Sequence, residues 1–181
     1  MKNVNTNNMR TMKYSELPNY SIICYSNNTL LGKAQKKLIG AKITHVATKR
    51  NTFVLENSIT KGKNGAQHTL FIDTLAHANI NELYALIPLF KIDNIKAIGL
   101  VNVVIDSNIK YSVKELFYLL IYKFTNVWIG DTSEITSVCS SFTAWFFNEL
   151  VDKFPNPYSY SPQKIFDEAE LNGFKIVKIE I

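Results

Sequence analysis

Short runs of alternating or continuous apolar residues dominate the first half of the chain, a pattern typical of β-strands. The run 20–25 is aromatic and β-branched and ends at two asparagines, which predicts a buried strand followed by a turn. Runs 43–48 and 52–56 have the same chemistry around a polar turn, so they predict a hairpin whose ends lie close together. Further strands are expected at 68–73, 82–88 and 174–181.

Apolar residues three and four positions apart predict helices, mainly in the second half of the chain. Ser112 and Glu115 have capping-box spacing, in which the serine accepts from the third backbone N–H and the glutamate reaches back. A serine-proline pair at 161–162 opens the last predicted helix, and an asparagine-glycine pair at 172–173 closes it. The predicted helices span 29–40, 94–105, 112–124, 139–151 and 161–171.

This succession of strands and helices indicates an α+β fold, with an antiparallel sheet or small barrel packed against helices. A length of 181 residues, 46% of them hydrophobic, supports a sizeable core, so a single domain over 18–181 is expected. Residues 1–17 carry little periodic apolar content and are predicted to form a flexible N-terminal arm.

Charge and cysteine content narrow the classes of function. The chain carries 20 Lys and Arg against 15 Asp and Glu, but the lysines are scattered, so no specific nucleic-acid partner is expected. Its two cysteines lie near no histidine at metal-ligand spacing, and the sequence indicates no disulfide framework, metal or cofactor. The first residues lack the apolar stretch of a signal peptide, and no segment is apolar over about 18 residues, as a membrane span requires. Synthesis as a soluble cytoplasmic protein without a transmembrane segment is therefore expected.

Cys139 is the first candidate for chemistry, because it lies at the predicted start of a helix, where free backbone N–H groups and the helix dipole favour a thiolate. The alternative interpretation is a small buried hydrophobic side chain between Val138 and Phe142. The other cysteine, Cys24, lies inside an apolar strand and is assigned to the core, where burial raises the pKa of a thiol.

His45 and Glu56 are the candidates that would complete a thiol site. Taken alone, His45 fits a buried, hydrogen-bonded strand residue without catalytic duty, and Glu56 fits an ordinary surface carboxylate. Together with a thiol they supply an imidazole that takes and returns the proton and a carboxylate that orients the ring. His68 and His77 are rival histidines, the second in a loop-like segment that gives the ring no fixed orientation.

Four motifs occur in an order that has a counterpart in a known family: Thr44-His45-Val46-Ala47, Val54-Leu55-Glu56-Asn57-Ser58, Val138-Cys139-Ser140-Ser141-Phe142 and Ser161-Pro162-Gln163-Lys164-Ile165. In this order the chain resembles the circularly permuted NlpC-like cysteine hydrolases of the papain superfamily, which include bacterial YiiX-type proteins and a similar poxvirus protein. The resemblance covers residues 18–181. It implies a papain-like fold permuted so that the histidine precedes the cysteine.

The resemblance implies a thiol peptidase or amidase in which Cys139 is the nucleophile, His45 the general base and acid, and Glu56 the residue that orients the imidazole. The implied substrate is a peptide or peptidoglycan amide. A lipid amide or ester comes second, for hydrolysis or acyl transfer, because similar permuted folds include lecithin retinol acyltransferase-like enzymes. The alternative from a different class is a non-catalytic binding or structural module on the same fold, for example in a virus particle. Neither the substrate nor the oligomeric state follows from the sequence.

Overall fold

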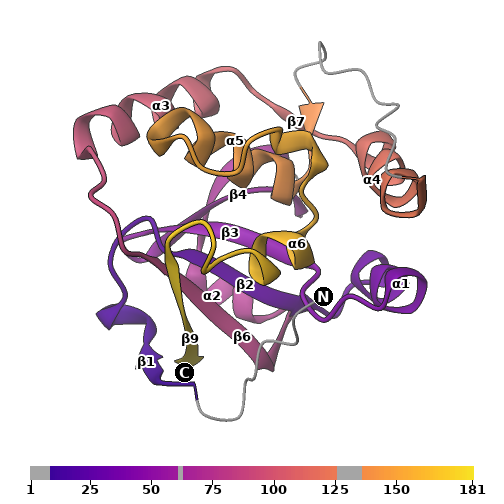
Figure 1. The fold of residues 1–181 in the computed structure, drawn as a ribbon, viewed down its shortest axis with the longest axis horizontal. Coiled ribbons are helices and arrows are strands. Elements are labelled where there is room, and N and C mark those ends of the chain that lie inside the picture. Colours follow the sequence, from indigo (N-terminus) through magenta and orange to yellow (C-terminus); the bar gives the residue numbers. More distant parts are fainter. Residues whose placement is uncertain (1–8, 61–62, 126–135) are drawn as a thin grey trace.

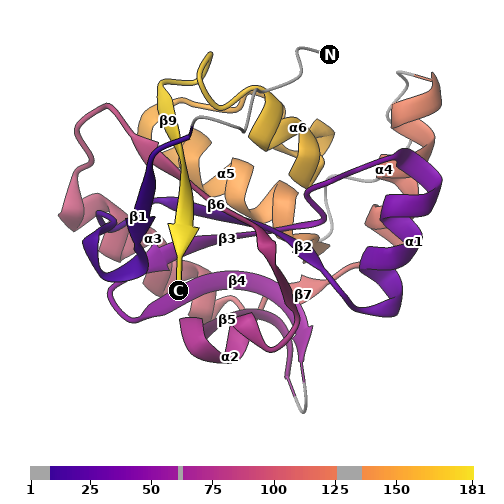
Figure 2. The same ribbon diagram turned by 90° about the horizontal axis from the view of Figure 1, so that it is seen from below.

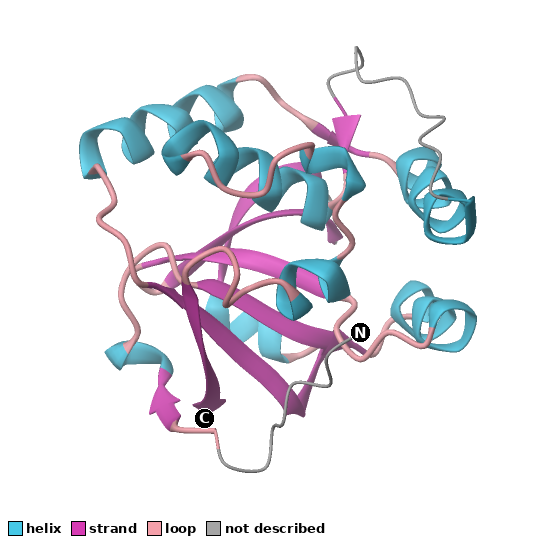
Figure 3. Cartoon of the chain, viewed as in Figure 1, coloured by secondary structure: helices cyan, strands magenta, loops and turns pink. Residues whose placement is uncertain are grey.

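A seven-stranded sheet forms the centre of the molecule, and helices cover it (Figures 1 and 3). The computed structural model describes residues 9–60, 63–125 and 136–181. The strand order is β1-β9-β6-β2-β3-β4-β5, and the only parallel neighbours in this described sheet are β1 and β9. The strands are β1 (Thr11–Lys13), β2 (Ile22–Asn27), β3 (His45–Arg50), β4 (Phe53–Thr60), β5 (Lys63–Leu70), β6 (Ala78–Pro88) and β9 (Phe174–Glu180). The fold is thus α+β, as predicted, with an open sheet and not a barrel.

The helices and a small second sheet complete the described structure (Figure 2). The helices are α1 (Leu30–Ile39), α2 (Phe71–Leu75), α3 (Asn94–Asp106), α4 (Val113–Thr125), α5 (Cys139–Val151) and α6 (Pro162–Asp167). Two short strands, β7 (Lys110–Tyr111) and β8 (Thr136–Ser137), pair in parallel and connect the region before α4 to the start of α5. Within the described ranges, no helix is both long enough and apolar enough to cross a bilayer.

Alternate residues of the central strands fill two separate cores, because successive side chains of a strand point to opposite faces. On one face, Cys24 and Val46 pack with Phe142 and Phe146 of α5. The cluster on the other face contains Ile23, Tyr25, Ala47, Val54, Leu17 and Phe71. Helix α5 therefore covers one face of the sheet, and α2 with the segment before β2 covers the other.

Local capping signals in the sequence correspond to observed caps. The Thr29 side chain accepts from the Gly32 backbone N–H at 3.3 Å, and Gly40 ends α1 with a left-handed φ of 62°. The Ser161 hydroxyl accepts from the Lys164 N–H at 3.1 Å, so α6 begins where the serine-proline pair predicts. These short-range interactions confirm the predicted starts of both helices.

The segment predicted to be a flexible arm differs from that prediction over residues 9–17. Residues 11–13 pair in parallel with residues 178–180, and the Lys178 N–H donates to the Arg10 carbonyl at 3.0 Å. Leu17 is only 3% exposed. The strand is too short to show a periodic pattern, and its order comes from main-chain bonds to a segment remote in the sequence.

Two predicted boundaries are also wrong. The strand expected at 68–73 ends at Leu70, and residues 71–75 form α2, which buries Phe71 and Thr74 three positions apart on one side. The last helix ends at Asp167 and not near residue 171. A series of turns then leads into β9 through Gly173, whose φ of 81° is left-handed.

We expect Gly65→Ala to lower the free energy of unfolding by about 1–3 kcal/mol, because Gly65 has a φ of 125° and an added Cβ would collide with the Ile109 carbonyl oxygen. The matched control is Gly99→Ala on the exposed side of α3, where an added Cβ meets nothing within 4 Å. That change should raise the free energy of unfolding by about 0.5–1 kcal/mol. Urea denaturation measures both, and equal values for the two variants would contradict the close approach of Ile109 to β5.

Candidate active site

His45 and Glu56 lie where two neighbouring strands separate. The pairing of β3 with β4 runs from Arg50–Phe53 to Thr48–Leu55 and stops there. Beyond that point β3 stays paired with β2 as far as His45, and β4 stays paired with β5. The two side chains therefore occupy the stretch in which no backbone pairing joins β3 to β4.

A buried hydrogen bond joins the two strands across this gap. Nε2 of His45 lies 2.8 Å from Oε2 of Glu56, and the two residues are 6% and 3% exposed. The second carboxylate oxygen of Glu56 accepts from the Thr69 hydroxyl on β5 at 2.7 Å. The carboxylate is thus held on both oxygens, which fixes the plane against which the imidazole is oriented.

The chain is also fixed immediately before His45. Oε1 of Gln163 on α6 accepts from the backbone N–H groups of Lys42 and Ile43 at 2.8 and 2.9 Å. The Thr44 hydroxyl accepts from the Asn27 N–H at 2.7 Å, and the Thr44 N–H donates to the Tyr25 carbonyl at 3.1 Å. These bonds fix the backbone immediately before His45, and this restricts the movement of its imidazole.

Cys139 is the first residue of α5, and its thiol lies within hydrogen-bonding reach of the His45 imidazole. The helix start is held by the Ser141 hydroxyl, which accepts from the Val138 N–H at 3.0 Å. Because Nε2 of His45 faces Glu56, Nδ1 is the nitrogen left for the thiol. The structure therefore brings together all three residues that the sequence singled out, and Cys139 itself is 3% exposed.

The electrostatics of the three groups favour a charged imidazole. Burial alone lowers the pKa of His45, but charge interactions and hydrogen bonds with Cys139 and Glu56 outweigh it and raise that pKa to about 10. Burial likewise raises the pKa of Glu56, but hydrogen bonds from His45 and Thr69 outweigh it, so the pKa ends below its usual value. The His45 ring, held between Glu56 and Cys139, is therefore an imidazolium at neutral pH.

The surroundings distinguish the two cysteines. Cys24 is completely buried in the core, and burial, followed by the nearby Cys139, raises its pKa well above the usual value. The Tyr25 ring, also buried, lies 4.9 Å from the His45 ring between centroids and covers it on one side. Cys24 is therefore a core residue, as predicted, and Cys139 is the cysteine that faces an imidazole.

Glu115 lies next to the site, although the sequence analysis predicted for it only a role in helix capping. Its backbone N–H donates to the Ser112 hydroxyl at 3.0 Å, which confirms half of the predicted capping box. The carboxyl group, however, lies against Ser141 and the Val138 N–H at the start of α5. Burial raises the pKa of Glu115 to about 7, although these two hydrogen bonds lower it. Its partners are remote in the sequence, so no local pattern could have identified them.

Thr69 was missed for a different reason. It supports Glu56 from β5, the strand for which the sequence predicted only the last part. Once β5 is known to pair with β4 over its whole length, Thr69 falls on the same face as Glu56, two positions along from Gln67, the residue directly opposite. Identifying Thr69 therefore requires the register of β4 against β5, and no sequence motif marks this residue.

The rival histidines are placed elsewhere. His68 is exposed, with Nε2 3.5 Å from an Arg50 guanidinium nitrogen, and burial with the Arg50 charge lowers its pKa. His77 is exposed in the turn between α2 and β6. Among the residues that the structure describes, no three His, Cys, Asp or Glu side chains gather as metal ligands would.

Comparison with known proteins does not assign the chain to a family. No protein-family model matches the chain, and a search of curated proteins finds no match.

We expect Thr69→Val to lower the free energy of unfolding by about 1.5 kcal/mol, because a buried carboxylate loses a hydroxyl donor. Thr48→Val on β3 is the matched control: Thr48 is 1% exposed, and in the described part of the chain its hydroxyl has no hydrogen-bond partner. The same change there should be neutral or stabilising. Denaturant titration of both variants measures the difference, and a Thr48→Val loss equal to that of Thr69→Val would contradict a specific role for Thr69.

Proposed function

We propose that this protein is a cysteine hydrolase that cleaves an amide bond through Cys139, His45 and Glu56. The observation that carries the proposal is the buried bond of 2.8 Å between His45 and Glu56, with the thiol of Cys139 on the other side of the ring. A nucleophile, a base that contacts it and a carboxylate that orients the base are the three parts that thiol catalysis requires.

The arrangement supports a two-step reaction. Nδ1 of His45 accepts the thiol proton, and the thiolate of Cys139 attacks the substrate carbonyl carbon to form a tetrahedral intermediate. The imidazolium returns the proton to the leaving amine as the C–N bond breaks, which leaves a thioester on Cys139. Water then loses a proton to His45 and attacks the thioester, releasing the acid and restoring the thiol. Glu56 keeps Nε2 of the ring protonated throughout.

The start of α5 supplies the environment for the negative charge of the intermediate. Cys139 is the first residue of the helix, so its backbone N–H has no carbonyl partner inside the helix and lies at the positive end of the dipole. We assign this N–H as one oxyanion donor. The second donor is not assigned.

The substrate class rests on the resemblance to permuted NlpC-like hydrolases. Peptide or peptidoglycan amides are the first class to test, and lipid amides or esters the second, with acyl transfer in place of hydrolysis if another nucleophile resolves the thioester. The formal charge of +5 suits either an anionic wall polymer or an anionic lipid, so it does not separate the two classes.

A non-catalytic module is the second candidate, and the burial of Cys139, which is 3% exposed, is the observation that favours it. In such a module the His45–Glu56 bond would serve only to join β3 to β4 where their backbones separate. The two functions differ in one measurable property, the reactivity of the thiol.

We expect Cys139 to react with iodoacetamide well below about pH 8, because the imidazolium of His45 persists at neutral pH and stabilises the thiolate. His45→Ala should abolish this reactivity in the acidic range, whereas His77→Ala, which removes an exposed histidine, should leave it unchanged. Mass spectrometry after timed alkylation across pH distinguishes Cys139 from Cys24, which should stay unmodified in the folded protein.

Circular dichroism establishes that each variant is folded, and Glu56→Gln provides a second test if His45→Ala unfolds. A Cys139 that titrates like a free thiol, or stays inert in the native protein and both histidine variants, would contradict the catalytic proposal and favour the non-catalytic module.

A further inference from the structure

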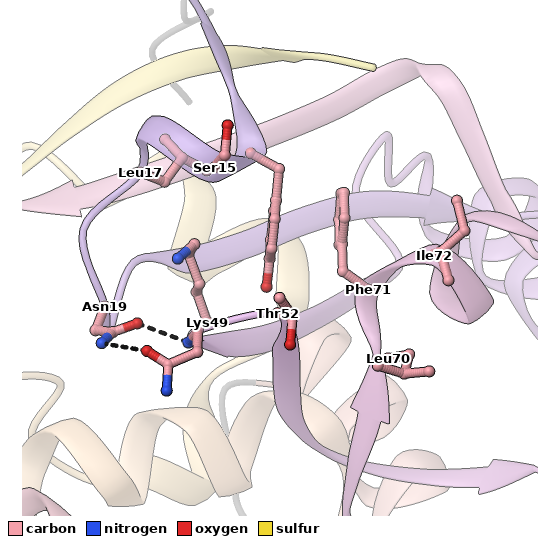
Figure 4. A pocket seen from close by; sticks show the side chains of 10 residues that line it. Ser15, Leu17, Asn19, Lys49, Thr52, Leu70, Phe71 and Ile72 are labelled. Atoms are coloured by element: carbon pink, nitrogen blue, oxygen red, sulfur yellow. Dashed lines mark hydrogen bonds between the residues drawn. The ribbon is translucent and has the colours of Figure 1, made fainter.

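A cavity of about 580 Å³ lies on the face of the sheet that α2 and the segment before β2 cover (Figure 4). The residues that line it are Tyr14, Ser15, Leu17, Asn19, Lys49, Asn51, Thr52, Leu70, Phe71 and Ile72. Its volume falls within the range of about 300–1,000 Å³ that small-molecule sites occupy. The lining is largely apolar with polar groups gathered at one end, which is the usual composition of a ligand site.

Lys49 is the one charged residue in this lining. It is 5% exposed, and in the part of the chain that the structure describes no carboxylate forms an ion pair with it. Burial lowers the pKa of Lys49. A lysine this deeply placed normally has an acidic partner, so its ammonium group marks a position at which an anion would be stabilised.

Aromatic rings hold the ammonium and form one wall of the cavity. Nζ of Lys49 lies 5.0 Å from the centre of the Tyr14 ring, and that ring stacks on Phe71 with centroids 3.7 Å apart and planes 5° from parallel. The Tyr14 hydroxyl donates to the Phe53 carbonyl at 2.9 Å. The tyrosine is therefore fixed by bonds other than those to a ligand, and the cavity is preformed.

The polar end of the cavity also contains a paired set of amides. The Asn51 backbone N–H donates to Oδ1 of Asn19 at 2.7 Å, and Nδ2 of Asn19 donates to Oδ1 of Asn51 at 3.0 Å (dashed lines in Figure 4). These two bonds use Oδ1 and the backbone N–H of Asn51, so its side-chain NH₂ is a further donor in the lining that also contains Lys49. An ammonium and an amide NH₂ together suit a carboxylate, which accepts on both oxygens.

The other end of the cavity is an apolar surface that the described chain leaves uncovered. Leu70 is 41% exposed and Ile72 is 66% exposed, next to the buried Phe71. Figure 4 shows Leu70 and Ile72 beyond Phe71, on the side away from Lys49. A ligand that spans the cavity would thus meet a cation at one end and hydrocarbon at the other.

We propose that this cavity binds a small amphiphilic carboxylate, a single carboxylate group on an unbranched apolar chain. Its carboxylate contacts Lys49 and Asn51, and its chain lies along Phe71, Leu70 and Ile72. The absence of any Asp or Glu from the lining gives the charge complementarity that selects an anion over a cation.

The site is separate from the candidate active site. Lys49 is four residues from His45 along β3, a distance of about 13 Å in an extended strand, and it lies next to the hairpin turn while His45 lies at the open end. Binding at Lys49 therefore does not depend on the proposed thiol chemistry.

The burial of the cation favours a free small molecule over a membrane surface. Recognition of anionic bilayers depends on several exposed basic residues, each contributing about 1 kcal/mol. Here the cavity lining holds a single ammonium, that of Lys49, and the residue is only 5% exposed.

The test is calorimetric titration of the full chain with dodecanoate below its micelle concentration, with dodecyltrimethylammonium as a probe of equal chain length and opposite charge. Dodecanoate should bind and the cation should not. Lys49→Met, which keeps the aliphatic stem, should weaken dodecanoate binding about tenfold through the loss of a charged hydrogen bond. Lys33→Met on the exposed side of α1 should leave the affinity unchanged.

A second pair of variants tests the apolar end without disturbing the core. Ile72→Asp should weaken dodecanoate binding by about tenfold, whereas Ile80→Asp, at a position 57% exposed on β6 and outside the cavity, should not change it. Equal affinity for the two probes, or an affinity unaffected by Lys49→Met and Ile72→Asp, would overturn the proposal. Lys49-dependent sedimentation with phosphatidylglycerol vesicles, without binding of free dodecanoate, would overturn it in favour of a membrane surface.

Discussion

The bond between His45 and Glu56 is the interaction on which the organisation of this molecule depends. The backbones of β3 and β4 part after Thr48 and Leu55, and the two side chains join them across the gap. A buried charged pair is costly to desolvate, so its presence requires compensating partners. Those partners are Thr69 on the carboxylate and Cys139 at the ring, which means that β5 and α5 must both be in place for the pair to be stable.

Several parts of this arrangement could be predicted from local sequence, because their physical causes are local. The caps at Thr29 and Ser161 act over three residues, and the hairpin of β3 and β4 follows from a polar turn between two apolar runs. The hairpin also explains why His45 and Glu56 were expected to lie near each other. Their meeting with Cys139 was a hypothesis drawn from residue types and motif order, since no local rule places residue 139 beside residue 45.

The features that escaped prediction all depend on pairings between distant segments. Residues 11–13 have too few apolar positions to show a period, yet their main-chain groups pair with β9. Glu115 has the spacing of a capping residue, but its carboxyl group contacts the start of α5 instead. The cavity around Lys49 was invisible for the same reason, because Tyr14 comes from the segment expected to be a flexible arm. Which distant segments pair or pack together does not follow from the local periodicity of either segment.

The position of β9 has a consequence for synthesis on the ribosome. In the sheet this strand lies between β1 and β6, although both of its neighbours are made much earlier. The edge of β6 that pairs with β9 therefore has no partner strand until residues 174–180 have emerged. Strand β1, which also pairs with β9, has no partner before then either. At rates of about 5–20 residues per second, the nascent chain exposes that edge for several seconds, an interval in which another polypeptide can pair with it.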